Sequence, residues 1–283
     1  MRYHESIIFF YAIYTKAADT IRALRKSLDS LITIHYSCEG LDDTNEGLSP
    51  RITSIAALHV GSMTMHSFSI HLVAEIEKIP KDEIDRKYDR LEARMLDDFF
   101  AFASTRSDCN WLHWKMSNIN FGFETLEHRF RVHHPDNQPY KINDSKKYDL
   151  SSLILTVYGE KCVDHPHMPN LMELNGGKNR DVLSGKEEVE VFKAKEYVKL
   201  HKSTMSKVYW FKNIFFLLAQ RKVVTSHSNW PAKVNDFSES WFSKLAGIVA
   251  LCFVFFQIAE TAHKYLGQKS PSNNPLQPSG SKK

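Results

Sequence analysis

Apolar side chains recur at steps of three and four residues along the N-terminal part of the chain. The series consists of Phe10, Tyr14, Ala17, Ile21, Leu24, Leu28 and Leu31. This period matches the α-helix and places the whole series on one side of it, whereas a strand requires a period of two. The segment is therefore predicted to be an amphipathic helix that packs against partner helices. Because Lys16 and Asp19 follow the short apolar run, we do not expect a cleaved signal peptide.

The same helical period recurs in several later segments. Long helices are predicted at residues 51–78, 82–105, 110–132 and 184–224, and a shorter one at 145–158. Ser184 and Glu187 have the Ser-x-x-Glu spacing of a capping box, which predicts the start of the last long helix. Together these patterns predict an all-α fold: a multi-helix, bundle-like domain without a sheet of three or more strands.

Composition agrees with a globular chain. Of its 283 residues, 42% are hydrophobic and 25% are charged, so a sizeable core can form. The excess of 37 Lys and Arg over 33 Asp and Glu gives a net charge of +4, which is too mild to indicate nucleic-acid binding. The cysteines at 38, 109, 162 and 252 contain no Cys-x-x-Cys pair. Their spacing excludes a zinc ribbon and favours reduced thiols.

The C-terminal part of the chain has a different character. The stretch from Leu245 to Ala259 contains no charged residue. Extended to 241–262, it reaches the length needed to cross a hydrocarbon core of about 30 Å. Trp241 and Tyr265 flank it, as interfacial aromatic residues do. The alternative is a hydrophobic helix that docks in the core of the domain.

These features define the predicted organisation of the chain. We expect a helical domain at 1–226, a hinge at 227–240, a membrane-anchor helix at 241–266 and a disordered tail at 267–283. The predicted localisation is a single-pass membrane protein whose N-terminal domain is cytoplasmic. The lipid bilayer is then a partner of the C-terminal helix.

Histidine is frequent, with 14 copies. His59 and His66 fall on the apolar stripe of the predicted helix at 51–78. A buried imidazole requires a hydrogen-bond partner or a metal, because an unpaired buried polar group costs about 1–3 kcal/mol. Two interpretations remain open for this pair: hydrogen-bonded core histidines, or a ligand or proton-relay site between helices.

Two carboxylate–histidine pairs bear on a possible metal site. His71 and Glu75 are four residues apart, and so are Glu124 and His128. Di-iron sites in helical bundles use Glu-x-x-His at a spacing of three, which neither pair has. Ordinary solvent-exposed pairs explain this spacing, so no metal site is predicted. No cofactor is expected either, because the chain has no glycine-rich phosphate-binding motif.

One further pair of residues has catalytic potential. Four residues separate Arg129 from His134 near the end of the predicted helix at 110–132. This spacing resembles the Arg-x4–6-His motif of HEPN-type ribonucleases, an all-α family. The resemblance implies metal-independent RNA cleavage by paired protomers, with Arg129 and His134 as catalytic residues. Such chemistry uses arginine to hold a phosphate and histidine to transfer a proton.

The motif also departs from that family. Phe130 stands where the family has a polar residue after its arginine, and Pro135 follows the histidine directly. The alternative interpretation is a basic helix C-terminus that complements the helix dipole.

The first functional hypothesis is therefore a membrane-tethered helical interaction or effector protein without an evident catalytic motif. The alternative is the HEPN-like ribonuclease, so enzymatic activity is left open. A homo-oligomer is a possible partner state under both hypotheses. Nucleic acid is expected as a partner only under the second, and the sequence does not identify a protein partner.

Overall fold

The computed structural model describes residues 2–40, 50–116 and 121–226, together with 248, 251 and 254–258; at 2–11 it describes the backbone only. The chain divides into two compact units, residues 1–229 and 230–283, and the elements described here belong to the first. In chain order they are α1 (Arg2–Lys26), η1 (Leu28–Ser30), β1 (Leu31–Cys38), β2 (Ile52–His59), β3 (Thr64–Ser69), α2 (Ile70–Ile76), η3 (Lys81–Glu83), η4 (Asp85–Lys87), α3 (Tyr88–Ser104), β4 (Asn110–His113), α4 (Phe123–His133), η5 (Asp144–Lys146), β5 (Lys147–Asp149), α5 (Leu150–Tyr158), α6 (His167–Leu174), α7 (Gly185–Lys193) and α8 (Tyr197–Ala219).

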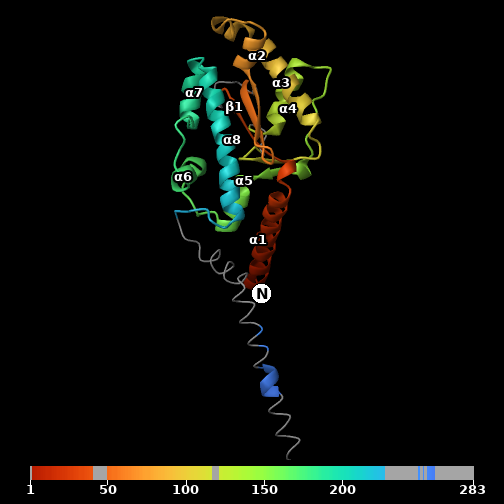
Figure 1. The fold of residues 1–283 in the computed structure, drawn as a ribbon, viewed down its shortest axis with the longest axis vertical. Helices are drawn as coiled ribbons and strands as arrows, with labels where there is room; N and C mark the ends of the chain where they lie inside the picture. The colour runs from red at the N-terminus through yellow and green to blue at the C-terminus, as the bar shows by residue number, and fades with distance from the viewer. Residues whose placement is uncertain are drawn as a thin grey trace, which may run out of the picture. The chain divides into compact units, whose positions relative to one another are not determined.

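A five-stranded mixed sheet lies at the centre of this unit, in the order β3-β2-β1-β4-β5. β2 runs antiparallel to β1 and β3, whereas β1, β4 and β5 run parallel to one another. Helices cover both faces (Figure 1): α8 packs on β1 and β2 on one side, and α3 packs on β2 and β3 on the other. The prediction of an all-α fold is therefore wrong. The fold is mixed α/β.

The composition of β2 explains why a helix was predicted at residues 51–78. In β1 and in β2 every residue except the last is buried. Ile32 and Ile34 belong to the core shared with α3 and α4, whereas Leu31 belongs to the core shared with α1, α5 and α8. In β2, Ile55 and Ala57 belong to the core shared with α3 and α4, and Ala56 and Leu58 pack with Val208 of α8, so apolar residues on both faces hide the period of two. Residues 51–78 consequently form β2, β3 and α2, not the predicted single helix. β1 keeps this period, because Ile32, Ile34 and Tyr36 alternate with the buried polar residues Thr33, His35 and Ser37.

Other predicted helices are confirmed or corrected in part. α1 confirms the N-terminal helix as far as Lys26, whereas Leu28 and Leu31 of the predicted apolar series lie in η1 and β1. α3 confirms the segment at 82–105 from Tyr88 onward, and α5 confirms the segment at 145–158 from Leu150 onward. The predicted helix at 110–132 is instead β4 followed by α4, and the predicted helix at 184–224 is divided into α7 and α8. The capping box is confirmed: Ser184 N–H donates to Glu187 Oε2 at 2.6 Å, and Glu187 N–H donates to Ser184 Oγ at 3.4 Å.

The membrane prediction also needs correction. Among the residues that the structure describes, no helix combines the length and the apolar character needed to cross a bilayer. This finding overturns the localisation as a single-pass membrane protein with a cytoplasmic N-terminal domain. Of the predicted anchor at 241–266, the structure describes residues 248, 251 and 254–258. The predicted hinge at 227–240 and tail at 267–283 lie outside the described residues.

Candidate functional sites

A buried carboxylate, Glu92 of α3, connects three elements of the α/β unit. Its side chain is fully buried, and its Oε1 accepts the backbone N–H of Ile52 at 2.6 Å. Arg129 of α4 donates to both carboxylate oxygens, with Nε at 3.0 Å from Oε1 and Nη2 on Oε2. His133 Nε2, one turn further along α4, lies 3.0 Å from Oε2. We call these three side chains, Glu92, Arg129 and His133, the α3–α4 clamp.

Electrostatics keep the clamp carboxylate ionised. Burial by itself would raise the pKa of Glu92, but hydrogen bonds from His133 and Arg129, the charge of Arg129 and the Ile52 amide outweigh it and lower that pKa. Tyr88, one turn before Glu92, donates its hydroxyl to the carbonyl of Ile52 at 3.0 Å. α3 thus satisfies both backbone groups of the first residue of β2.

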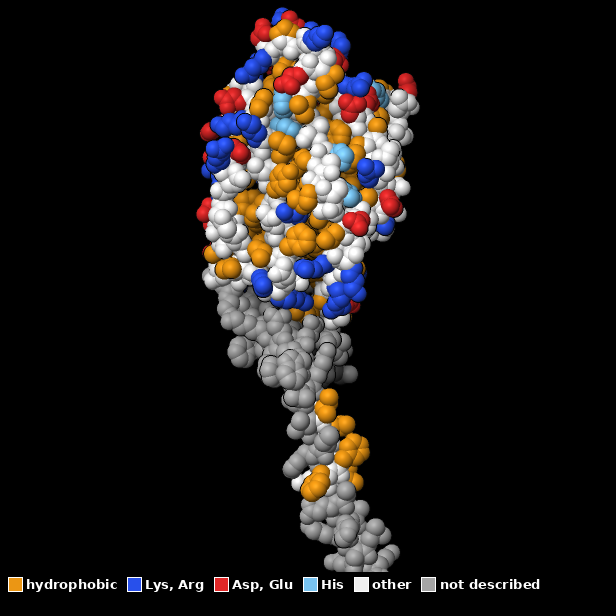
Figure 2. Space-filling model, in the orientation of Figure 1, with side chains coloured by type: hydrophobic (Ala, Val, Ile, Leu, Met, Phe, Trp, Pro, Cys, Tyr) orange, Lys and Arg blue, Asp and Glu red, His pale blue; other side chains and the backbone are white. Residues whose placement is uncertain are grey.

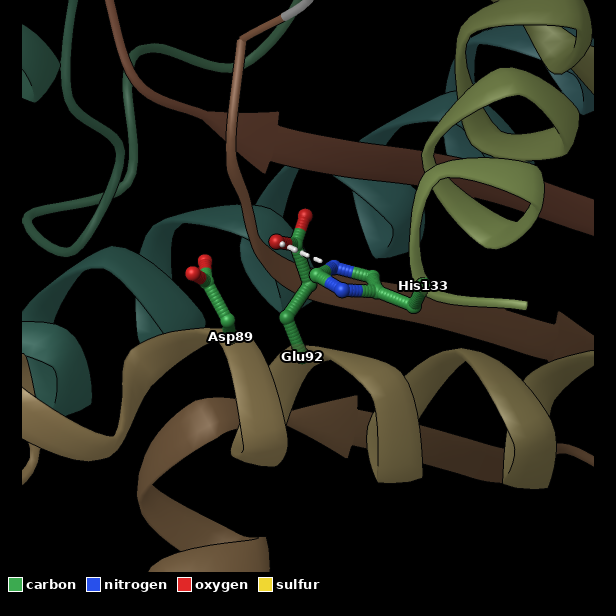
Figure 3. Close-up of side chains that lie close together, drawn as sticks. All are labelled: Asp89, Glu92 and His133. Carbon is green, nitrogen blue, oxygen red and sulfur yellow. Dashed lines mark hydrogen bonds and ion pairs between the residues drawn. The ribbon is translucent and has the colours of Figure 1, made fainter. Parts of the chain in front are cut away.

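Proximity alone makes this region a candidate metal site. Asp89, Glu92 and His133 place ligand atoms within 4.8 Å of one another. Figure 3 shows both carboxylates rising from α3, with Glu92 between Asp89 and His133 and bonded to the imidazole. However, both Glu92 oxygens already accept N–H groups, and Arg129 holds a positive charge against them. A divalent cation would have to displace Arg129, so the donor set does not fit a metal ion.

The structure places the two predicted catalytic residues against different acids of α3. Arg129 pairs with Glu92 in the clamp, whereas His134 Nε2 lies 3.0 Å from Asp97 Oδ1 and its ring packs on Phe130. The histidine beside Arg129 is His133, whose Nε2 is 3.4 Å from Arg129 Nη2. The proposed catalytic pairing of Arg129 with His134 stays a prediction.

A second buried polar cluster lies between β1 and α8. Lys207 Nζ donates to Glu188 Oε1 at 2.7 Å, and the same oxygen accepts the hydroxyls of Ser203 and Ser37 at 3.1 and 3.3 Å. Nearby His35 is buried, and its Nδ1 has no hydrogen-bond partner in the described part of the chain. Burial, followed by the charge of Lys207, lowers the pKa of His35 well below its usual value. These contacts join α7 and α8 to β1.

A cavity of about 480 Å³ lies beside the β2–β3 hairpin. The charged residues that line the cavity come from two segments, one directly before β4 and one directly before β1. Arg106 and Asp108 come from the connection between α3 and β4, and Asp29 comes from η1. The hairpin adds hydroxyl groups from Ser62 and Thr64. The cavity therefore contains groups of both charges and several neutral donors.

These charged groups are not paired with one another. Within the described residues, Arg106 makes hydrogen bonds only through Nη1, to the carbonyl and hydroxyl of Thr105 at 3.2 and 3.3 Å. Its guanidinium carbon lies 5.4 Å from the centre of the Phe102 ring. Among those same residues, no cation lies within ion-pair distance of Asp29 or Asp108; the Asp108 carboxylate receives only a thiol contact at 3.9 Å. An arginine and two carboxylates thus share the cavity without neutralising each other.

The two histidines predicted on an apolar stripe both line this cavity. His59 Nδ1 accepts the N–H of Ser62 at 3.3 Å, and its Nε2 lies 2.7 Å from the carbonyl oxygen of Asp29. His66 lies on Phe102 at a ring separation of 4.4 Å and has no hydrogen-bond partner among the described residues. Burial, followed by the charge of Arg106, lowers the pKa of His66. His59 thus holds the hairpin, whereas His66 offers a neutral imidazole to the cavity.

The two carboxylate–histidine pairs have different surroundings. Glu124 and His128 are exposed on α4. His71 is half-buried at the start of α2, with Glu75 exposed one turn later.

Sequence reasoning missed Glu92, Arg106, Asp29 and Asp108. Glu92 lies in an ordinary amphipathic helix, and the others follow or precede regular elements at positions without a fixed spacing. Comparison with models of known protein families, with curated proteins and with solved structures finds no match.

Proposed function

We propose that this chain is a non-catalytic binding protein for a small zwitterion of the amino-acid or short-peptide class, held in the cavity beside the β2–β3 hairpin. The observation that carries the proposal is the unpaired Arg106 in the same cavity as unpaired Asp29 and Asp108. A ligand with a carboxylate and an ammonium group satisfies both kinds of charge at once.

The dimensions and the remaining lining agree with such a ligand. Cavities of about 300–1,000 Å³ hold small molecules, and this one measures about 480 Å³. His66, Ser62 and Thr64 supply neutral donors and acceptors that orient polar ligand groups. The proposal belongs to the class of interaction or effector proteins and involves no membrane.

Calorimetric titration with the free amino acids tests the proposal. Each amino acid that binds is compared with its carboxamide, which lacks the carboxylate, and with its N-acetyl derivative, which lacks the ammonium group. Both derivatives are expected to bind about 10- to 100-fold more weakly, because hydrogen bonds to charged groups contribute about 1.5–3 kcal/mol.

Two variants assign the charges to residues. In Arg106→Gln the amino acid and its carboxamide are expected to bind equally. In Asp108→Asn the preference for the amino acid over its N-acetyl derivative is expected to shrink. Arg94→Gln is the matched control, because Arg94 is exposed on α3, outside the cavity, where it pairs with Asp98. Absence of amino-acid binding at millimolar concentration, or equal binding of all three ligand forms by the parent protein, would contradict the proposal.

The ribonuclease hypothesis remains a prediction, and no contact described above favours it over ligand binding. Any RNA-cleavage assay of an Arg129 variant needs a parallel measurement of folding, because Arg129 is a member of the α3–α4 clamp.

A further inference from the structure

Two histidines from different helices approach each other above a pair of serines. Ser54 of β2 and Ser69 of β3 are cross-strand partners in the sheet. Ser54 Oγ lies 2.6 Å from Nδ1 of His201, on α8. Ser69 Oγ lies 2.8 Å from Nδ1 of His71, on α2. Each serine hydroxyl can accept the Nδ1 hydrogen, which leaves a lone pair on Nε2 of each ring.

The ring geometry suits a shared ligand. The centres of the His71 and His201 rings are 5.2 Å apart, and the ring planes make an angle of 61°. Two imidazoles bound to one tetrahedral zinc ion have centres about 5 Å apart, since the Zn–N distance is about 2.0–2.1 Å. Neither Nε2 has a hydrogen-bond partner among the described residues. Figure 2 shows that charged side chains of both signs and apolar side chains are mixed over the visible face of the α/β unit, with histidines among them.

We propose that His71 and His201 form a binding site for a divalent transition-metal ion of the zinc class, with water completing the coordination. Among the described residues, no third carboxylate, thiol or imidazole lies close enough to both rings to complete a set of three protein ligands. Imidazole nitrogen favours zinc, copper and nickel over magnesium and calcium. The serines act as positioning residues, because a hydrogen bond to the second ring nitrogen sets the tautomer and the direction of the ligand.

The state of the two rings agrees with this assignment. Burial, followed by the charge of His71, lowers the pKa of His201 to about 4, and burial lowers the pKa of His71. Both rings are consequently neutral at pH 7, as metal ligands must be. Two such ligands on separate helices would connect α2 to α8, so metal binding is also expected to stabilise the fold.

Titration of the untagged full-length chain with Zn²⁺ alone tests the site, with Co²⁺ as a spectroscopic probe. The parent protein is expected to bind one Zn²⁺ and to show visible absorption with Co²⁺. His71→Gln is the main variant because His71 is half-buried and makes few core contacts; it is expected to weaken Zn²⁺ binding by about 10-fold or more. Ser54→Ala is expected to weaken binding without abolishing it.

His128→Gln and Cys109→Ser are the controls, because neither residue belongs to the site. Unchanged affinity in both controls supports the assignment. The proposal is overturned if the parent protein binds no Zn²⁺, or if His71→Gln binds it as tightly as the parent does. Loss of binding in Cys109→Ser alone would assign the metal to a thiol instead and would also overturn the proposal. Circular dichroism of each variant separates weakened binding from unfolding.

Discussion

Glu92 shows how one side chain can hold an interface together. Its two oxygens receive the amide of Ile52, two nitrogens of Arg129 and Nε2 of His133. Both members of the ion pair are buried, so each charge depends on the other for compensation. A buried pair contributes little net stability compared with an apolar replacement, but removal of one partner is costly.

This reasoning makes a prediction about paired substitutions. Glu92→Gln and Arg129→Met are each expected to lower the free energy of unfolding by about 3–5 kcal/mol, because one charge is left buried without its partner. The double variant is expected to lose clearly less than the sum of the single losses. Urea unfolding measures all three values.

The exposed pair Arg94 and Asp98 on the same helix is the control. Arg94→Met is expected to cost less than about 1 kcal/mol, as exposed ion pairs do. Strict additivity of the two clamp substitutions would show that Glu92 and Arg129 do not interact as described.

At the scale of elements, the β2–β3 hairpin depends on one close approach. A side chain at Gly61 would place its Cβ 2.3 Å from Asp29 Oδ1 and 2.8 Å from Asp29 Cα. His59 binds the carbonyl of Asp29 at the same point. The hairpin turn therefore sits directly on η1, and the absence of a side chain at Gly61 permits it.

Gly61→Ala is accordingly expected to destabilise the protein by about 1–3 kcal/mol, since Asp29 must move. Gly185→Ala provides the opposite case. Gly185 is in the first turn of α7 and has no atom within 4 Å of the added methyl group. That variant is expected to gain about 0.4–1 kcal/mol by restricting the unfolded chain. Thermal unfolding of both variants tests the contrast, and equal effects would contradict the described packing of the turn.

At the scale of the whole molecule, three of the four buried histidines among the described residues have a pKa far below the usual value and are neutral in the folded state at pH 7. Burial lowers the pKa of His113 to about 4 and that of His201 to about 4, and burial with the charge of Lys207 lowers the pKa of His35 well below normal. In the unfolded chain the pKa of each histidine is about 6.5. Because the pKa of each histidine is lower in the folded state, the unfolded state binds more protons at every pH between the folded and the unfolded pKa.

Stability is therefore expected to be insensitive to these groups above about pH 6.5 and to fall as the pH decreases toward 5. Each histidine contributes a slope of at most about 1.4 kcal/mol per pH unit. Urea unfolding at several pH values measures the slope. His35→Leu is expected to reduce it, whereas exposed His128→Gln is expected to leave it unchanged. A protein equally stable at pH 7.5 and 5 would contradict this account of the buried rings.

Features that depend on local interactions could be inferred from the sequence. The apolar stripe of α1, most of α3 and the capping box of Ser184 and Glu187 all follow from contacts within a few residues. Helical periodicity and capping are local properties, so the pattern that predicts them is contained in one short segment. By contrast, the three-and-four spacing at 51–78 coincided with two strands and a short helix.

The sheet and the candidate sites required the tertiary structure. Helices cover both faces of β2, and apolar residues on both of its sides hide the period of two that marks a strand. β1 does show that period, but its place at the centre of the sheet follows only from its pairing with β2 and β4. Arg129 of α4 meets Glu92 of α3, and the cavity joins Asp29 to Arg106, through packing of elements that no sequence spacing relates. Which groups meet is decided by how these elements pack, and the apolar pattern of each segment specifies a buried face without specifying its partner.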